Sequence, residues 1–132
     1  MGVKGPQGIL EASLYATDLA AARRFYEGVL GLECVAYEPP RHAFFRAGRG
    51  MLLVFDPRET ARSQDVPAHG ASGPGHVALS VAAAELEAWA ARLEAAGVAV
   101  RRAGWPGGES LFFRDPAGNL LELAPPQIWG IS

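Results

Sequence analysis

Several features that would assign the chain to a specialised class of protein are scarce or missing in its 132 residues. Cys34 is the only cysteine, so no disulfide can form within the chain; this favours a reducing compartment, and we expect Cys34 to be buried rather than nucleophilic. No apolar run approaches the roughly 20 residues of a membrane span, and the opening MGVKGPQG lacks the apolar core of a signal peptide. A net charge of −2 provides no basic surface for nucleic acid. We therefore expect one cytoplasmic domain over residues 1–132, with neither a membrane nor a nucleic acid as partner.

No phosphate-binding glycine loop and no Ser-His-Asp order stands out, but the chain does contain an internal repeat. The segment 44–55 (FFRAGRGMLLVF) aligns without a gap with 112–123 (FFRDPAGNLLEL). In each half, an alternating strand precedes a helix that stops at a glycine, and strand-like segments follow. This order predicts an α+β fold of two βαβββ modules, over about 8–56 and about 75–126.

The boundaries of the expected elements follow from periodicity, caps and turns. Helices are expected from the N-cap Asp18 to the stop at Gly31, and over 83–96 up to Gly97. Strands are expected at 9–15, 32–37, 42–47, 51–56, 75–81, 98–102, 109–114 and 119–124. The linker 57–74, together with Gly75, is rich in proline and glycine and has too few apolar residues for a packed element. We predict a mobile segment there that orders near the site when a ligand binds, with a passive connector as the alternative.

Strand alternation gathers the chemically active side chains on one face of each module. Asp115-Pro116-Ala117-Gly118 predicts a turn in which Asp115 pairs with Asn119 and Phe112 pairs with Glu122. The residues expected on this face of the second module are Ser110, Phe112, Arg114, Leu120 and Glu122. By the ungapped repeat, those of the first module are His42, Phe44, Arg46, Leu52 and Val54. Glu11 and His76 fall on the same face by their own alternation.

Glu11, His76 and Glu122 form the candidate metal site. Glu122 interrupts an otherwise apolar strand, where a lone carboxylate is costly unless it is paired or bound to a metal. Two carboxylates and one imidazole suit Zn, Mn, Fe, Ni or Co, and three protein ligands leave positions open for substrate. Either Glu11 or Glu122 is then a candidate base. The simpler alternatives are solvated glutamates at positions 11 and 122 and a capping or core histidine at 76.

The remaining residues of this face are candidates for a substrate pocket. His42 is a base, a substrate contact or a structural residue. Arg46 and Arg114 hold an anionic substrate or are simply solvated. Phe44 and Phe112, joined by Trp105, provide an apolar wall.

Three segments, YATDLAAARRFYEGVLGLE, GPGHVALSV and FFRDPAGNLLEL, together resemble the signatures of the vicinal oxygen chelate superfamily, which includes glyoxalase I, extradiol dioxygenases, fosfomycin-resistance thiol transferases and bleomycin-resistance proteins. The resemblance implies a half-open barrel of two βαβββ modules, often completed by a homodimer whose sites combine modules of two chains. It also implies a small-molecule substrate and one divalent metal ion per site.

Position by position, the resemblance assigns His76 and Glu122 to the second-module ligands. Glu11 stands where the first-module ligand is usually histidine, and Val54 stands where glyoxalase I has a further glutamate. Ser110 and Phe112 match substrate contacts of the fosfomycin-resistance enzymes.

Two functional hypotheses follow from these residues. The first is a glyoxalase-like lyase or isomerase that uses a divalent metal to stabilise an oxyanion; oxygenation and thiol transfer remain open within the same superfamily. The second is a metal-free protein of the bleomycin-resistance type that binds a drug or metabolite. His76 and Glu122 favour the enzyme, whereas the loss of histidine at position 11 favours the binding protein.

Overall fold

The computed structural model describes residues 2–132 and contains two four-stranded mixed sheets. The first sheet has the order β1-β4-β3-β2, and the second has the order β5-β8-β7-β6. The strands of the two sheets are β1 (Glu11–Tyr15), β2 (Glu33–Glu38), β3 (His42–Ala47), β4 (Gly50–Phe55), β5 (His76–Ser80), β6 (Arg101–Trp105), β7 (Gly108–Arg114) and β8 (Leu120–Ala124). β1 pairs with β4 and β5 pairs with β8 in parallel, and all the other strand pairs are antiparallel. The two predicted βαβββ modules are confirmed.

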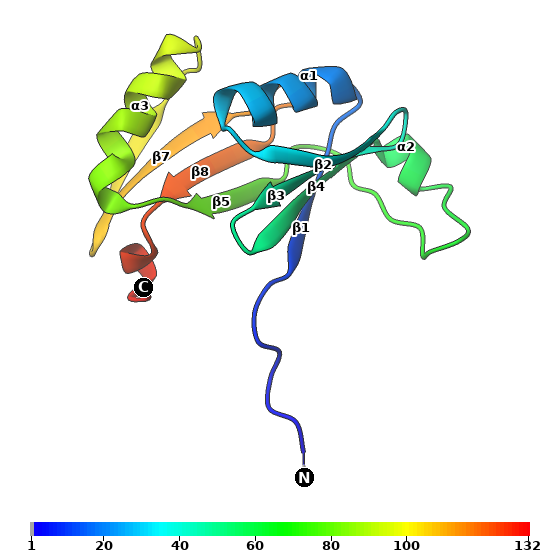
Figure 1. The fold of residues 1–132 in the computed structure, drawn as a ribbon, viewed down its shortest axis with the longest axis horizontal. Helices are drawn as coiled ribbons and strands as arrows, with labels where there is room; N and C mark the ends of the chain where they lie inside the picture. Colours follow the sequence, from blue (N-terminus) through cyan, green and yellow to red (C-terminus); the bar gives the residue numbers. More distant parts are fainter. Residues whose placement is uncertain (1) are drawn as a thin grey trace.

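Each module has one main helix, and both helices lie on the same side of the sheets (Figure 1). α1 (Leu19–Arg23) begins at Asp18, whose carboxylate accepts a hydrogen bond from Ala21 N, and continues as the π-helix η1 (Arg24–Val29). α3 (Leu86–Ala95) follows the 3₁₀ turn η2 (Ala83–Glu85). Gly31 and Gly97 adopt positive φ values of 73° and 77° directly after these helices, as expected for C′ glycines.

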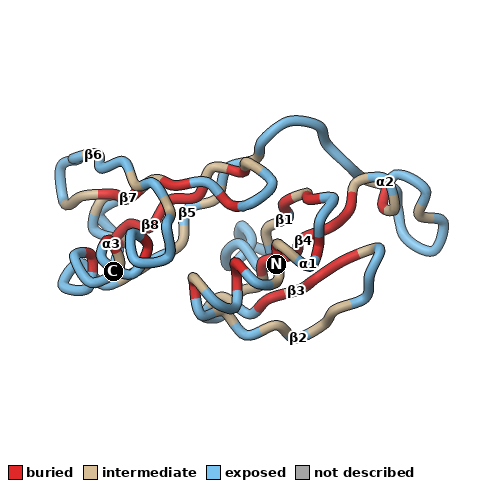
Figure 2. The backbone as a smooth tube through the Cα atoms, turned by 90° about the horizontal axis from the view of Figure 1, so that it is seen from above, coloured by how far each residue is buried: buried red, intermediate tan, exposed pale blue. Residues whose placement is uncertain are grey.

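One hydrophobic core spans both modules on the helix side of the sheets. Leu14, Phe45 and Val54 contribute to it from the first module, and Leu93 and Leu121 from the second. Figure 2 shows the buried stretches along the strands of both sheets, whereas most of the linker after α2 is exposed. Because the helices occupy one side of the sheets, the opposite side, here called the open face, is free to carry a site.

A buried polar network ties the two modules together. The Tyr26 hydroxyl on η1 donates to Asp115 Oδ2 at 2.6 Å, and burial beside this carboxylate raises the pKa of Tyr26. Asn119 Nδ2 donates to the backbone carbonyl of Tyr15 at 3.1 Å, while its Oδ1 accepts from Gly75 N at 2.8 Å. These bonds fix the turn between β7 and β8 against the ends of β1 and β5.

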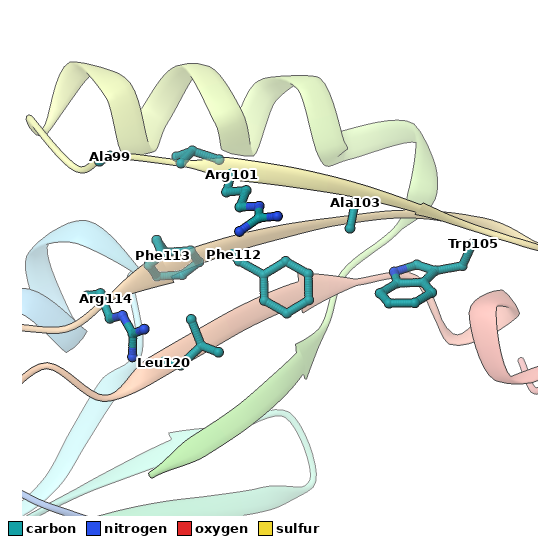
Figure 3. Close-up of a pocket in the computed structure, with 9 residues that line it drawn as sticks. Ala99, Arg101, Ala103, Trp105, Phe112, Phe113, Arg114 and Leu120 are labelled. Carbon is teal, nitrogen blue, oxygen red and sulfur yellow. The ribbon is translucent and has the colours of Figure 1, made fainter. Parts of the chain in front are cut away.

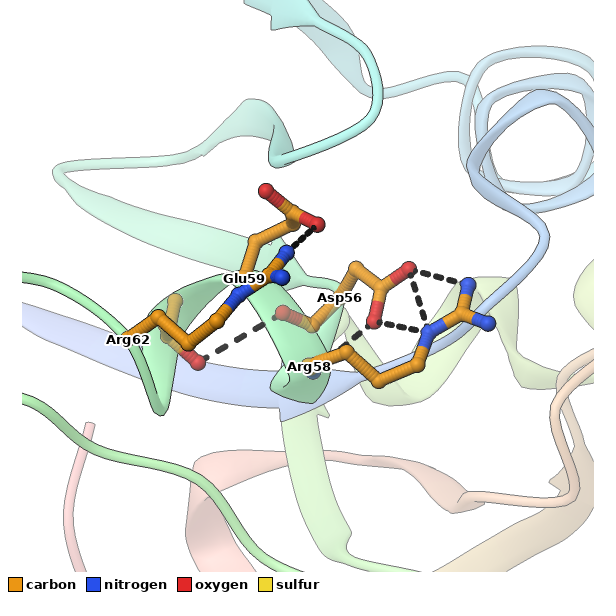
Figure 4. A network of polar contacts seen from close by, with 5 residues as sticks. Asp56, Arg58, Glu59 and Arg62 are labelled. Carbon is orange, nitrogen blue, oxygen red and sulfur yellow. Dashed lines mark hydrogen bonds and ion pairs between the residues drawn. The ribbon is translucent and has the colours of Figure 1, made fainter.

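The linker contains more structure than its composition predicts. α2 (Pro57–Thr60) begins at Asp56, whose carboxylate accepts from Arg58 N and from the Arg58 guanidinium (Figure 4). This pairing holds the pKa of Asp56 below its usual range. Thr60 is fully buried, so the expectation that 57–75 lacks a packed element is wrong for its first turn. The mobility of the remaining linker stays a prediction.

Two further differences concern strand and tail boundaries. β6 starts at Arg101 rather than at 98, because Val98 and Val100 pack on the core before the strand begins. The tail forms the 3₁₀ helix η3 (Pro126–Trp129), which was not predicted. Within residues 2–132, no helix is both long and apolar enough to cross a membrane.

Candidate functional site

His76 and Glu122 come together on the open face of the second module. His76 lies beside Leu120 in the parallel β5–β8 pair, and Glu122 lies opposite Phe112 in the β7–β8 hairpin, as the sequence predicted. The distance between His76 Nε2 and Glu122 Oε1 is 3.4 Å. The Glu122 side chain is 10% exposed, whereas that of His76 is 48% exposed, so the pair sits at the edge of solvent.

The hydrogen bonding of His76 determines which ring nitrogen is free. His76 Nδ1 lies 2.9 Å from the backbone carbonyl of Leu120. A carbonyl can only accept, so Nδ1 carries the proton and donates. In the neutral ring, the lone pair of Nε2 then faces the Glu122 carboxylate. Two electron-rich atoms at this distance call for a cation between them, either a proton on Nε2 or a metal ion.

Ser110 and Trp105 hold the other oxygen of Glu122. The Ser110 hydroxyl donates to Glu122 Oε2 at 2.5 Å, and Trp105 Nε1 donates to Ser110 Oγ at 2.8 Å. Ser110 is fully buried, so this chain of bonds restrains the carboxylate and directs Oε1 toward His76. The sequence placed Ser110 on this face but gave no sign of the Trp105 bond, because β6 was expected to end at 102.

The third predicted ligand, Glu11, does not join this pair. In the described part of the chain, residues 2–132, no group of three His, Cys, Asp or Glu side chains is placed to hold a metal ion. Glu11 is exposed on β1 and pairs with Met51 of β4 in the first module. A single chain therefore assembles two of the three predicted ligands.

An apolar pocket of about 510 Å³ lies on the same face of the second module (Figure 3). Phe112 and Leu120 form its floor, and Trp105, Arg101 and Arg114 line its sides. The Phe112 ring stacks beside the His76 imidazole at a centroid distance of 6.2 Å, so the pocket adjoins the His76–Glu122 pair. Phe112 and Arg114, which the sequence assigned to a substrate pocket, both line it, while Arg101 was not predicted; that the pocket binds a substrate stays a prediction.

The open face of the first module is aromatic. The His42 imidazole stacks on Phe44 at 4.0 Å, and Phe55 meets both rings edge-on. Arg41 Nη1 lies 2.8 Å from His42 Nδ1, and since a guanidinium can only donate, Nδ1 is the acceptor. Burial and the charge of Arg41 lower the pKa of His42. His42 is therefore a neutral ring with its Nδ1 lone pair already engaged.

Arg46 lies on this open face of the first module, but it already has a partner. Its Nε lies 3.5 Å from Glu33 Oε1 on the neighbouring strand, and both side chains are exposed. An exposed pair of this kind contributes little to stability.

Val54 and Leu52 are not on the open face, and this prediction is wrong. The β3–β4 register pairs Phe44 with Leu53 and Ala43 with Val54, and Val54 is fully buried in the core. The hairpin turn contains Gly48 and Arg49, one residue fewer than the turn after Asp115. A difference of one residue reverses the faces of every later position in the strand. The counterpart of Glu122 in the first module is therefore Leu53.

Comparison with known proteins agrees with this architecture. A sequence model of the Glyoxalase/Bleomycin resistance protein/Dioxygenase superfamily matches residues 8–123. The chain is similar to a lactoylglutathione lyase from Agrobacterium tumefaciens, with 43% identity and a TM-score of 0.93 over 97% of this chain and 100% of that one. No curated protein matches.

Two further structures share the fold at lower identity. A glyoxalase/bleomycin resistance protein/dioxygenase from Nocardioides has 25% identity and a TM-score of 0.71 over 94% of this chain and 85% of that one. The fosfomycin resistance protein FosX from Mesorhizobium loti has 21% identity and a TM-score of 0.66 over 92% and 93% of the two chains, a likeness of fold alone.

Proposed function

Because the chain belongs to the Glyoxalase/Bleomycin resistance protein/Dioxygenase superfamily, we propose that it is a metal-dependent lyase or isomerase of the glyoxalase type that acts on a small oxygenated substrate. The observation that carries this proposal is the His76–Glu122 pair, which presents a free imidazole nitrogen and a restrained carboxylate oxygen beside an apolar pocket. The 43% identity to a lactoylglutathione lyase supports the same class of reaction.

The two side chains fit a divalent ion in donor type and in separation. One imidazole nitrogen and one carboxylate oxygen are ligands that Zn, Mn, Fe, Ni and Co accept. Two ligands that lie about 2.1 Å from one tetrahedral ion are about 3.4 Å apart. The distance between His76 Nε2 and Glu122 Oε1 is 3.4 Å. When bound there, a divalent ion supplies a Lewis acid for the oxygen atoms of the substrate.

We propose that the third ligand is Glu11 of the partner subunit in a homodimer. Within the internal repeat, Glu11 beside Met51 is the counterpart of His76 beside Leu120. Leu53 stands in the first module at the position of Glu122. The first module therefore offers one ligand, whereas the second offers two. Two copies related by a twofold axis can combine both modules into two equivalent sites of three ligands.

In this proposal, the residues around the metal site have separate roles. Ser110 fixes one oxygen of Glu122, Phe112 and Leu120 exclude water from one side of the substrate, and Glu11 or Glu122 takes a proton from the substrate when it is not holding the ion. A water-poor setting makes such a carboxylate a stronger base, and the apolar side chains of Phe112 and Leu120 provide one side of that setting.

Metal binding by the full-length protein tests the proposal. Protein purified without chelators or an affinity tag is expected to contain about one divalent ion per chain by elemental analysis. Glu122→Gln is expected to remove the ion. Glu109 is a half-exposed residue of β7 that pairs with Arg102, and Glu109→Gln is expected to leave the metal content unchanged. Turnover of lactoylglutathione is then measured with each variant. Equal metal content in both variants would refute the assignment.

A metal-free binding protein is the second candidate, because residues 2–132 of one chain assemble only two ligands beside a large apolar pocket. Protein that stays metal-free after incubation with each of the five ions, and that still binds an apolar ligand, would favour this candidate.

A further inference from the structure

The pocket of the second module carries two arginines without an acidic partner. Arg101 on β6 and Arg114 at the end of β7 both line it, and among residues 2–132 neither makes an ion pair. The described residues that line the pocket include no aspartate or glutamate. Arg114 Nη1 donates one bond to the Gly118 carbonyl, and its other N–H groups are free of protein acceptors in the described chain.

The neighbouring Arg102, which lies outside the pocket, does have acidic partners. Arg102 points to the helix side, where its guanidinium donates to both oxygens of Glu87 and also to Glu109. Arg102 therefore pairs with two carboxylates on the helix side, whereas no carboxylate lines the pocket that contains Arg101. Cations gathered at an apolar pocket without counter-charges favour an anionic ligand.

The strand register places Arg101 and Arg114 near the Phe112 ring. Arg101 lies directly opposite Phe112, and Arg114 lies two residues further along β7 on the same face. Figure 3 shows Arg101 next to the Phe112 ring, Arg114 next to Leu120, and Trp105 further along the pocket. Phe112 is in turn opposite Glu122, so one row across the sheet runs from cation to aromatic ring to candidate metal ligand.

We propose that the pocket selects a ligand with an apolar body and a single carboxylate, the body resting on Phe112 and Leu120 and the carboxylate held by Arg101 and Arg114. Two strand spacings, about 10 Å, separate the Cα atoms of Arg101 and Glu122. The carboxylate thus binds at the end of the pocket remote from His76 and Glu122. Only one part of this proposal rests on the proposed function, namely that the opposite end of the ligand reacts. The binding of the carboxylate is independent of the proposed function.

A matched pair of probes, 4-phenylbutyrate and 4-phenylbutyramide, tests this selectivity. Both are titrated into the full-length protein with a chelator present, and binding is followed by the amide NMR shifts of Phe112 and Leu120. The carboxylate is expected to bind about tenfold more tightly than the amide. Arg101→Gln and Arg114→Gln are each expected to weaken carboxylate binding about three- to fivefold and to leave amide binding unchanged.

Arg49→Gln is the control, because Arg49 is exposed in the β3–β4 turn, outside the pocket. It is expected to change neither affinity. Equal binding of the two probes, equal loss in all three variants, shifts confined to other residues, or no binding at the solubility limit would each overturn the proposal. Since the titration is done without metal, a failure to bind metal leaves this result intact, and a failure here leaves the metal site untouched.

Discussion

Two histidines on the open faces differ in what their hydrogen bonds leave free. The Leu120 carbonyl accepts a hydrogen bond from Nδ1 of His76, so Nε2 is the ring nitrogen that faces Glu122. Arg41 donates a hydrogen bond to Nδ1 of His42 and so occupies the lone pair there. The same ring therefore turns one nitrogen toward a carboxylate in the second module and forms a neutral aromatic surface in the first. The sequence alone offered both as functional histidines, since neither the carbonyl nor the guanidinium contact follows from strand alternation.

Ser110 should govern the affinity for metal without being a ligand. Ser110→Ala removes the bond to Glu122 Oε2 and leaves the Trp105 N–H without its acceptor. Loss of such an orienting contact is expected to weaken divalent-ion binding by about 10- to 100-fold. Calorimetric titration of the metal-free protein with Zn²⁺ measures the change.

Ser80→Ala provides the comparison for Ser110, because Ser80 is exposed on β5 of the same module. Its affinity for Zn²⁺ should equal that of the unmodified protein. If Ser110→Ala also binds Zn²⁺ as tightly, the Ser110–Glu122 bond has no part in preparing the site.

The lowered pKa of His42 should make the protein less stable in mild acid. Burial and Arg41 hold this pKa below the ordinary value of 6.5. As the pH falls below 6.5, the unfolded chain binds a proton that the folded protein does not, so the free energy of unfolding decreases until the folded pKa is reached. Urea unfolding at a series of pH values should show this slope, and it should be smaller in His42→Gln. An NMR titration that places the pKa of His42 at or above 6.5 would contradict the assignment.

At the scale of elements, turn chemistry decided which predictions of the site were correct. Asp115-Pro116-Ala117-Gly118 specifies its turn strongly, so the pairing of Phe112 with Glu122 could be predicted from the sequence. Gly48 and Arg49 form a shorter turn that the ungapped repeat concealed, and Val54 was assigned to the wrong face. Val98 and Val100 pack on the core before β6 begins, so the strand runs on to Trp105. The sequence included Trp105 in the apolar wall but could not predict its bond to Ser110 or the place of Arg101 in the pocket. Local propensity fixed which elements exist, whereas register depends on turns and core packing.

A pair of glutamate substitutions tests the register of β4. Val54→Glu places a carboxylate in the core, where Val54 is fully buried, and should cost about 4 kcal/mol or more of unfolding free energy. Leu53→Glu places it on the open face, opposite Phe44. Leu53 is 8% exposed but lies outside the core cluster that contains Val54, so its loss should be clearly smaller. Chemical denaturation compares the two. A larger loss for Leu53→Glu would mean that the open face was assigned to the wrong residues.

At the scale of the whole molecule, the internal repeat has diverged into unequal halves. The second module holds His76, Glu122 and the pocket, while the first contributes Glu11 and a wall of aromatic rings. The network of Tyr26, Asp115 and Asn119 fixes how the halves sit within one chain, and in that arrangement Glu11 does not join the other two ligands in the described residues. Strand alternation could assign all three to the open faces, but it carries no information on which faces meet. The proposed homodimer would bring Glu11 of one chain to His76 and Glu122 of the other.

Mixing two defective variants tests whether the metal site is shared between chains. Glu11→Gln and Glu122→Gln should each bind no metal alone. In a heterodimer of the two, one site receives Glu11 from one chain and Glu122 from the other and is complete, while the second site lacks both. Random exchange of equal amounts makes half of the dimers mixed, so metal content should recover to about a quarter of that of the unmodified protein. Different affinity tags allow the heterodimer to be isolated for elemental analysis. No recovery in that heterodimer, or a monomer by light scattering at micromolar concentration, would show that the site is not built from two chains.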